Sequence, residues 1–279
     1  MNYYMYLCSI DNSELNIMKE DMRKLFFMAA VALTAMGANA QKVKYSISGV
    51  VADSVKEVVI VVNNNKNSTQ TIAAANGRFT ATGETEKNDM LTVGHDIAKG
   101  FNSLKVFNDG EAIELNLVEN TIKGSAQNTA LGNHIHANEP NNVRMQTLAK
   151  EYHSLRGKND PESETRMGEI MKEAMSIEEQ TSKANLDYIK SHKNDVTPLA
   201  FLPDMIYDLS FSELSDILTP DAAYYNHPMA ARPKKMLEGL RKRQPGVMFT
   251  DLVMNDTEGK ERKLSEWVGK GNYVLVDFW

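Results

Sequence analysis

The chain has 279 residues, of which 42% are hydrophobic and 24% charged, a composition typical of a globular protein with one large domain or two ordinary ones. The formal net charge of -6 at pH 7, with Lys and Arg scattered, argues against nucleic acid as a partner. No apolar run reaches the roughly 20 residues that a membrane-crossing helix needs, so we expect no stable membrane span in the mature chain.

Residues 22–40 have the pattern of a secretory signal peptide. Basic Met22-Arg23-Lys24 is followed by the apolar stretch Leu25–Leu33, and small residues end at Ala38-Asn39-Ala40. A buried helix of the fold is the alternative, but nothing beside the stretch offers a helix cap or a partner face. We therefore predict cleavage between Ala40 and Gln41, and export by the Sec route to the periplasm or cell envelope. No Cys stands at the junction, which argues against a lipid anchor.

Residues 1–21 lie upstream of this signal and contain four acidic residues, which the basic start of a signal peptide should not. We interpret them as an over-long start of the sequence. The only cysteine, Cys8, lies in this segment. The mature chain would then contain no thiol for a disulfide or for a nucleophilic thiolate.

Residues 41–125 read as a β-rich domain, because short alternating or β-branched runs are separated by turn residues. Asn63-Asn64-Asn65 and Asn76-Gly77 mark turns, since Asn and Gly tolerate positive φ. This spacing predicts an antiparallel β-sandwich or open barrel. The expected strands are Val43–Val51, Glu57–Val62, Thr69–Ala73, Arg78–Thr82, Met90–Val93, Leu104–Phe107 and Ala112–Val118.

Residues 126–244 form the predicted helical region, so that the fold class is α+β. Apolar residues recur at three- and four-residue steps from Met167 to Ile177, and we interpret the Met side chains there as adaptable core. The break at Pro245-Gly246 indicates a boundary. The expected helices are Asn141–Arg156, Glu162–Lys190, Pro198–Leu209, Phe211–Leu218 and Lys234–Arg243.

Residues 245–279 show a third pattern. We expect a short strand at Phe249–Leu252, a turn at Glu258-Gly259 and a helical turn at Leu264–Trp267. The run Tyr273–Trp279 is nearly all apolar and β-branched or aromatic, which is typical of a central strand covered on both faces.

This third pattern resembles the opening of the periplasmic thioredoxin-like family, which includes membrane-linked thiol–disulfide reductases and, more distantly, alkyl hydroperoxide reductase and thiol-specific antioxidant proteins. The resemblance implies an incomplete thioredoxin-like α/β domain that stops before the family's Cys-x-x-Cys, with Asp277 and Trp279 as supporting residues or plain core residues. The matching residues are Phe249, Leu252, Glu258-Gly259-Lys260, Leu264-Ser265, Gly269-Lys270 and Val274-Leu275-Val276-Asp277-Phe278-Trp279.

The segment from Lys42 to Gly124 is similar to the domain of unknown function 4369, through its Tyr45-x-Ile47-x-Gly49 start and its Asn76-Gly77-x-Phe79 hairpin. That domain commonly precedes a helical stretch and a thioredoxin-like domain in exported bacterial proteins. The combined resemblance implies the N-terminal portion of an envelope thiol–disulfide oxidoreductase, acting on envelope proteins with disulfides and itself inactive without redox cysteines. The alternative is a non-enzymatic periplasmic binding or scaffold module.

The residues alone predict no catalytic, cofactor-binding or metal site. There is no Walker loop, dinucleotide fingerprint or nucleophile elbow. His134-x-His136 would place two imidazoles on one side of an extended segment, with Glu139 close by. Three possible ligands in a polar loop are a weak signal, however, and we interpret the segment as an ordinary exposed turn.

Overall fold

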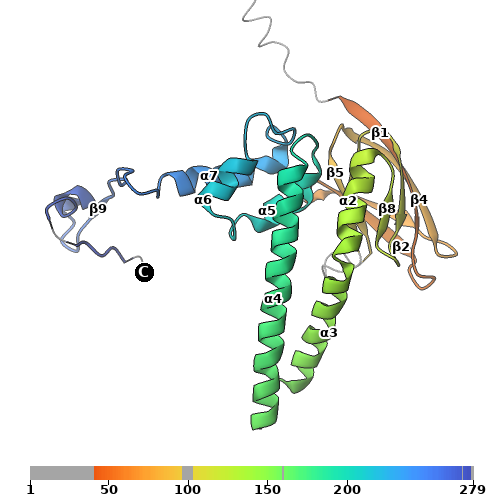
Figure 1. Ribbon diagram of the computed structural model, residues 1–279. Coiled ribbons are helices and arrows are strands. Elements are labelled where there is room, and N and C mark those ends of the chain that lie inside the picture. The colour runs from red at the N-terminus through yellow and green to blue at the C-terminus, as the bar shows by residue number, and fades with distance from the viewer. Residues whose placement is uncertain (1–40, 96–102, 159, 272, 278–279) are drawn as a thin grey trace, which may run out of the picture.

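The computed structural model describes residues 41–95, 103–158, 160–271 and 273–277. The predicted signal at 22–40 and Cys8 lie outside the described residues, and Gln41 is the first residue inside them. The described chain begins with two open four-stranded sheets and continues into a helical region, which gives an α+β fold (Figure 1).

The first sheet has the strand order β4-β1-β7-β8. Its β1–β4 and β7–β8 pairs are antiparallel, whereas β1 and β7 run parallel, so the prediction of a wholly antiparallel domain is wrong at this pair. Strand β8 has only three residues, too short for an alternating pattern, and was not predicted. The strands are β1 (Lys42–Val50), β4 (Arg78–Glu86), β7 (Ala112–Asn116) and β8 (Thr121–Lys123).

The second sheet has the order β3-β2-β5-β6, and all its pairs are antiparallel. Its strands are β2 (Glu57–Val62), β3 (Asn65–Ala73), β5 (Met90–Gly94) and β6 (Ser103–Phe107), each at a predicted strand position. Since each sheet has two edge strands, the described residues form no closed barrel.

Positive-φ asparagines make the predicted turns. Asn63 and Asn64 have φ of 47° and 57° and join β2 to β3 as a two-residue hairpin. Asn76 and Gly77, with φ of 52° and 70°, carry the chain from the second sheet to the first, and the flanking Ala75 and Arg78 exchange two backbone hydrogen bonds.

Two aromatic rings cover glycines across the β1–β4 pair. Phe79 lies opposite Gly49 and Tyr45 lies opposite Gly83, and a Cβ at either glycine would come within 2.3 Å of the facing side chain. Only glycine leaves room for these rings, which then contribute to the core. Packing between β1 and β4 therefore explains the Tyr and Gly of the Tyr-x-Ile-x-Gly motif.

Both sheets contribute to one hydrophobic core, which includes Ile47 of β1, Ile60 of β2 and Leu91 of β5. A second core lies among the helices and takes in Met90 and Phe107 from the second sheet. Strand β5 is buried along its whole length, because one face meets the first core and the other meets the second. The helical region is thus packed on the second sheet through β5 and β6.

Helix α2 (Ala126–Ala137) packs against β8, and α3 (Glu139–Leu155) and α4 (Pro161–Ser191) form a long antiparallel hairpin that extends away from the sheets (Figure 1). The remaining short helices are η2 (Thr197–Ala200), α5 (Leu202–Met205), α6 (Phe211–Ile217), η3 (Pro228–Ala230) and α7 (Ala231–Arg241). None of the helices in the described ranges is both long and apolar enough to cross a membrane.

The C-terminal segment, residues 247–277, stands apart from both cores (Figure 1). Its strand is β9 (Val253–Asn255), paired with β10 (Glu261–Lys263), rather than the predicted Phe249–Leu252. The turn at Gly259, with φ of 80°, and the helical turn η4 (Leu264–Glu266) confirm those two predictions. Tyr273–Asp277 forms no strand within the described chain and its residues are exposed, so the central strand that was predicted there, with both faces covered, is not present.

Candidate functional site

A pocket of about 310 Å³ lies where strand β6, the α2–α4 helices and α5 meet, and we call it the junction pocket. Its position follows from the fold, because η2 packs on β6, α2 and α4, and α5 follows η2 directly in the chain. The lining residues are Ser103, Leu104, Lys105, His134, Ile135, Asn138, Asn142, Thr181, Asn185, Ala200, Phe201, Asp204 and Met205.

His134 is held in one place in the pocket wall. Its Nε2 lies 2.8 Å from Asn185 Oδ1, so the ring donates there as the Nε2–H tautomer. The ring also lies against Tyr188, with centroids 4.4 Å apart, and meets Phe201 edge-on at 5.2 Å. Burial raises the pKa of Tyr188 to about 12, so this phenol stays protonated at neutral pH.

The two charged groups in the pocket wall neutralise each other. Lys105 Nζ lies 3.1 Å from Asp204 Oδ2 and donates to the Ala200 carbonyl at 2.7 Å. This ion pair links β6 to α5. The remaining polar groups in the lining, apart from His134, are neutral amides and hydroxyls, from Ser103, Asn138, Asn142, Thr181 and Asn185.

The three possible ligands considered in the sequence, His134, His136 and Glu139, do not come together in the structure. His134 and His136 lie on helix α2 rather than on an extended segment, and residues two apart on a helix point in nearly opposite directions. His136 is exposed, and Glu139 accepts a hydrogen bond from Asn120 at 3.0 Å. Within the described ranges, no group of His, Cys, Asp and Glu is arranged to hold a metal.

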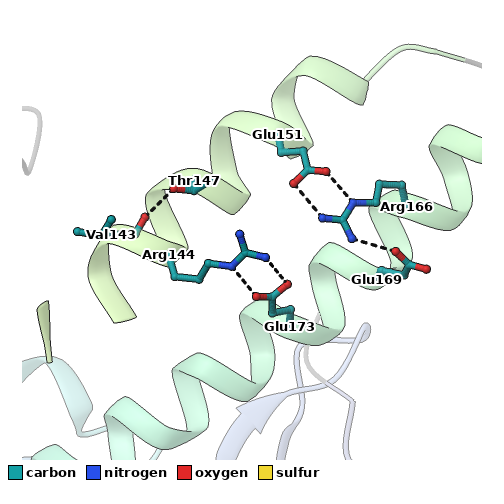
Figure 2. A network of polar contacts seen from close by, with 7 residues as sticks. All are labelled: Val143, Arg144, Thr147, Glu151, Arg166, Glu169 and Glu173. Carbon is teal, nitrogen blue, oxygen red and sulfur yellow. Dashed lines mark hydrogen bonds and ion pairs between the residues drawn. The ribbon is translucent and has the colours of Figure 1, made fainter. Parts of the chain in front are cut away.

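A ladder of ion pairs joins α3 to α4 (Figure 2). Arg144 of α3 donates two hydrogen bonds, of 2.6 and 2.8 Å, to the carboxylate of Glu173 on α4. Arg166 of α4 donates two, of 2.6 and 3.0 Å, to the carboxylate of Glu151 on α3. These bonds hold the pKa of each glutamate below its usual range. Satisfied bidentate pairs of this kind fix helix register rather than transfer protons.

The residues carrying the redox resemblance lie in the C-terminal segment. Asp251 accepts hydrogen bonds from the backbone and side chain of Ser265, which closes the segment on itself. A pocket of about 720 Å³ lies within this segment and is lined by residues including Leu252, Trp267 and Val274. Asp277 is exposed, and Trp279 lies outside the described residues.

The sequence did not predict the junction pocket, because the residues that line it are spread from position 103 to position 205 and come together only in the fold. A signal exists only in part: Asn138 and Asn142 stand four residues apart at the start of α3 and Asn185 lies on α4, but similar asparagines occur elsewhere in the chain.

Residues 45–131 match the family model described as "Domain of unknown function (DUF4369)". This part of the chain, which runs from β1 into α2, is therefore a DUF4369 domain. No curated protein and no solved structure matches the chain.

Proposed function

We propose that this chain is exported to the bacterial envelope and serves there as the leading part of a thiol–disulfide oxidoreductase. In this proposal the DUF4369 domain and the helices hold a thioredoxin-like domain whose first elements are the C-terminal segment. The redox step would belong to a Cys-x-x-Cys placed after Trp279, where a thiolate at a helix N-terminus attacks a disulfide of an envelope protein.

One observation carries this proposal. The residues that resemble the thioredoxin-like family lie in the C-terminal segment, in and around β9, β10, η4 and Tyr273–Asp277. Apolar side chains in this segment face solvent, and Leu275 is 94% exposed. An apolar stretch exposed to water is unfavourable, because its side chains lack the buried surroundings that a central strand would give them.

The experiment is to isolate the endogenous protein from cell envelopes with an antibody against residues 41–246, and to measure insulin reduction by dithiothreitol. We expect rate enhancement by the endogenous protein, abolished by thiol alkylation, and none by a recombinant chain of residues 1–279. Endogenous protein that has the mass of the given chain and no activity would refute the proposal.

A non-enzymatic binding module is the second candidate. The junction pocket and the projecting α3–α4 hairpin favour it, since both are formed without the C-terminal segment. The insulin assay separates the two candidates, because a binding module gives no rate enhancement in any form.

A further inference from the structure

We propose that the junction pocket binds a neutral saccharide of one or two rings. This inference is independent of the redox proposal, because the pocket shares no residue with the C-terminal segment.

Charge in the pocket argues for a neutral ligand. Lys105 and Asp204 are paired at 3.1 Å, and Lys105 is also engaged by the Ala200 carbonyl, so the wall offers an ionic ligand no unpaired charge. The Asp204 side chain is 70% exposed, so water screens the pair and an ionic ligand would gain little by exchanging one of its partners. A neutral ligand leaves it intact.

The neutral polar groups match hydroxyls. Asn138, Asn142 and Asn185 come from the α2–α3 joint, α3 and α4. The NH₂ groups of Asn138 and Asn142 already reach the His134 carbonyl at 3.0 Å and the Glu139 carboxylate at 3.5 Å, so these two amides offer a ligand chiefly their carbonyl oxygens. A sugar hydroxyl also donates and accepts, so neighbouring hydroxyls pair with such amides. Asn185 Oδ1 accepts from His134, and its NH₂ group makes no hydrogen bond within the described part of the chain. Because His134 fixes the orientation of the Asn185 side chain, its NH₂ group is suited to donate to a ligand oxygen.

The rest of the wall is apolar and includes an aromatic ring. Phe201 is half-buried, and Ile135 and Met205 lie beside it in the lining. A sugar ring has C–H groups on its faces, which pack on an aromatic ring while its edge hydroxyls reach the amides. The volume of about 310 Å³ lies at the lower end of ligand pockets, which limits the ligand to a small one.

An extended peptide fits this place less well. Peptides that add to a sheet need a free run of strand edge, and β6 is the edge strand here. Asn128 already occupies both backbone groups of Phe107 on β6, at 2.8 Å each. The edge left open is therefore short.

The test is saturation-transfer NMR on the purified chain with glucose, galactose, mannose, N-acetylglucosamine, maltose and cellobiose as separate probes. Glucuronate, glucose 6-phosphate and an uncharged tripeptide serve as counter-probes. We expect at least one neutral sugar to bind saturably. Its charged analogue should bind about tenfold more weakly, which corresponds to the loss of one or two interactions with the ligand.

Variants test whether the sugar binds in the junction pocket. Asn142→Ala removes an exposed side chain and should leave the fold intact, and Phe201→Ala removes the aromatic wall. Each should weaken sugar binding about tenfold, while Asn133→Ala, an exposed asparagine outside the pocket, should not. The proposal is overturned if no neutral sugar binds at millimolar concentration, if Asn142→Ala and Phe201→Ala both bind as the parent does, or if the tripeptide or a charged analogue binds more tightly.

Discussion

Asn128 acts as a substitute for a strand partner. Its side-chain amide donates to the Phe107 carbonyl and accepts from the Phe107 amide, both at 2.8 Å, and the residue is fully buried. An antiparallel neighbour would make the same two bonds. The side chain thereby satisfies the edge of β6 with a residue of α2 and fixes the helix on the sheet.

We predict that Asn128→Ala lowers the free energy of unfolding by about 3 kcal/mol, because it leaves two buried backbone groups without partners. Urea unfolding followed by circular dichroism measures this change. Asn133→Ala, an exposed residue of the same helix, should change stability by less than about 0.5 kcal/mol. Equal stability of the two variants would show that water replaces the Asn128 bonds.

His227 ties the helices to the β-domain in its neutral form. Its Nε2 donates to the Asn88 carbonyl at 3.2 Å, and its Nδ1 accepts from the Met229 amide at 3.2 Å. Protonation at Nδ1 would remove that acceptor. Burial lowers the pKa of His227 from 6.5, against the opposing attraction of Asp89 and Glu86.

A lowered histidine pKa means that the unfolded chain binds the proton more readily, so this group destabilises the folded state as pH falls below about 6.5. We expect the parent chain to lose more stability between pH 7.5 and 5.5 than His227→Gln, measured by urea unfolding. His136→Gln, which changes an exposed histidine, should behave as the parent. A parent and a His227→Gln variant with the same pH dependence would contradict this assignment.

At the scale of elements, two helical glycines differ in the space around them: Gly132 is tightly packed and Gly168 is not. A Cβ at Gly132 of α2 would lie 2.8 Å from the Cβ and carbonyl oxygen of Ile122, so this glycine permits α2 to approach β8 closely. A Cβ at Gly168 of α4 would meet nothing within 4 Å. The first glycine is required by packing, and the second only costs helix stability.

We therefore predict that Gly168→Ala raises the free energy of unfolding by about 0.5–1 kcal/mol, the difference in helix propensity between Gly and Ala. Gly132→Ala should lower it by about 1–3 kcal/mol, because the added methyl group forces α2 away from β8. Thermal and urea unfolding of the two variants beside the parent chain test the pair. Destabilisation by Gly168→Ala would indicate that α4 packs on something at this position.

The sequence predicts elements better than their assembly. Alternation located β1 to β7, and the asparagine turns at 63–64 and 76–77 were recognisable because they need positive φ. Helix α2 was missed, since Gly132 and the His-x-His pair resemble a loop when the contact with β8 is unknown. The parallel β1–β7 pair and the junction pocket join residues far apart in the chain, which periodicity does not encode.

For the whole molecule, the two cores meet at β5, and the C-terminal segment belongs to neither. The β-domain and the helices therefore share one buried sheet and should unfold together. The C-terminal segment has one three-residue strand pair, which is marginal in water by itself. Its bonds, such as Asp251 to Ser265, are exposed.

We predict that hydrogen exchange in the purified chain separates these parts. Amides of β1, β2 and β5 should exchange slowly, because opening them exposes a shared core. Amides of 247–277 should exchange close to the unfolded rate, since few buried contacts offset the roughly 1–2 kcal/mol of backbone entropy per ordered residue. Size-exclusion chromatography must show a monomer, because association would protect an apolar strand. Slow exchange across 273–277 in such a monomer, matching that of β5, would show that this stretch pairs within the chain and would remove the main support for a redox domain beginning there.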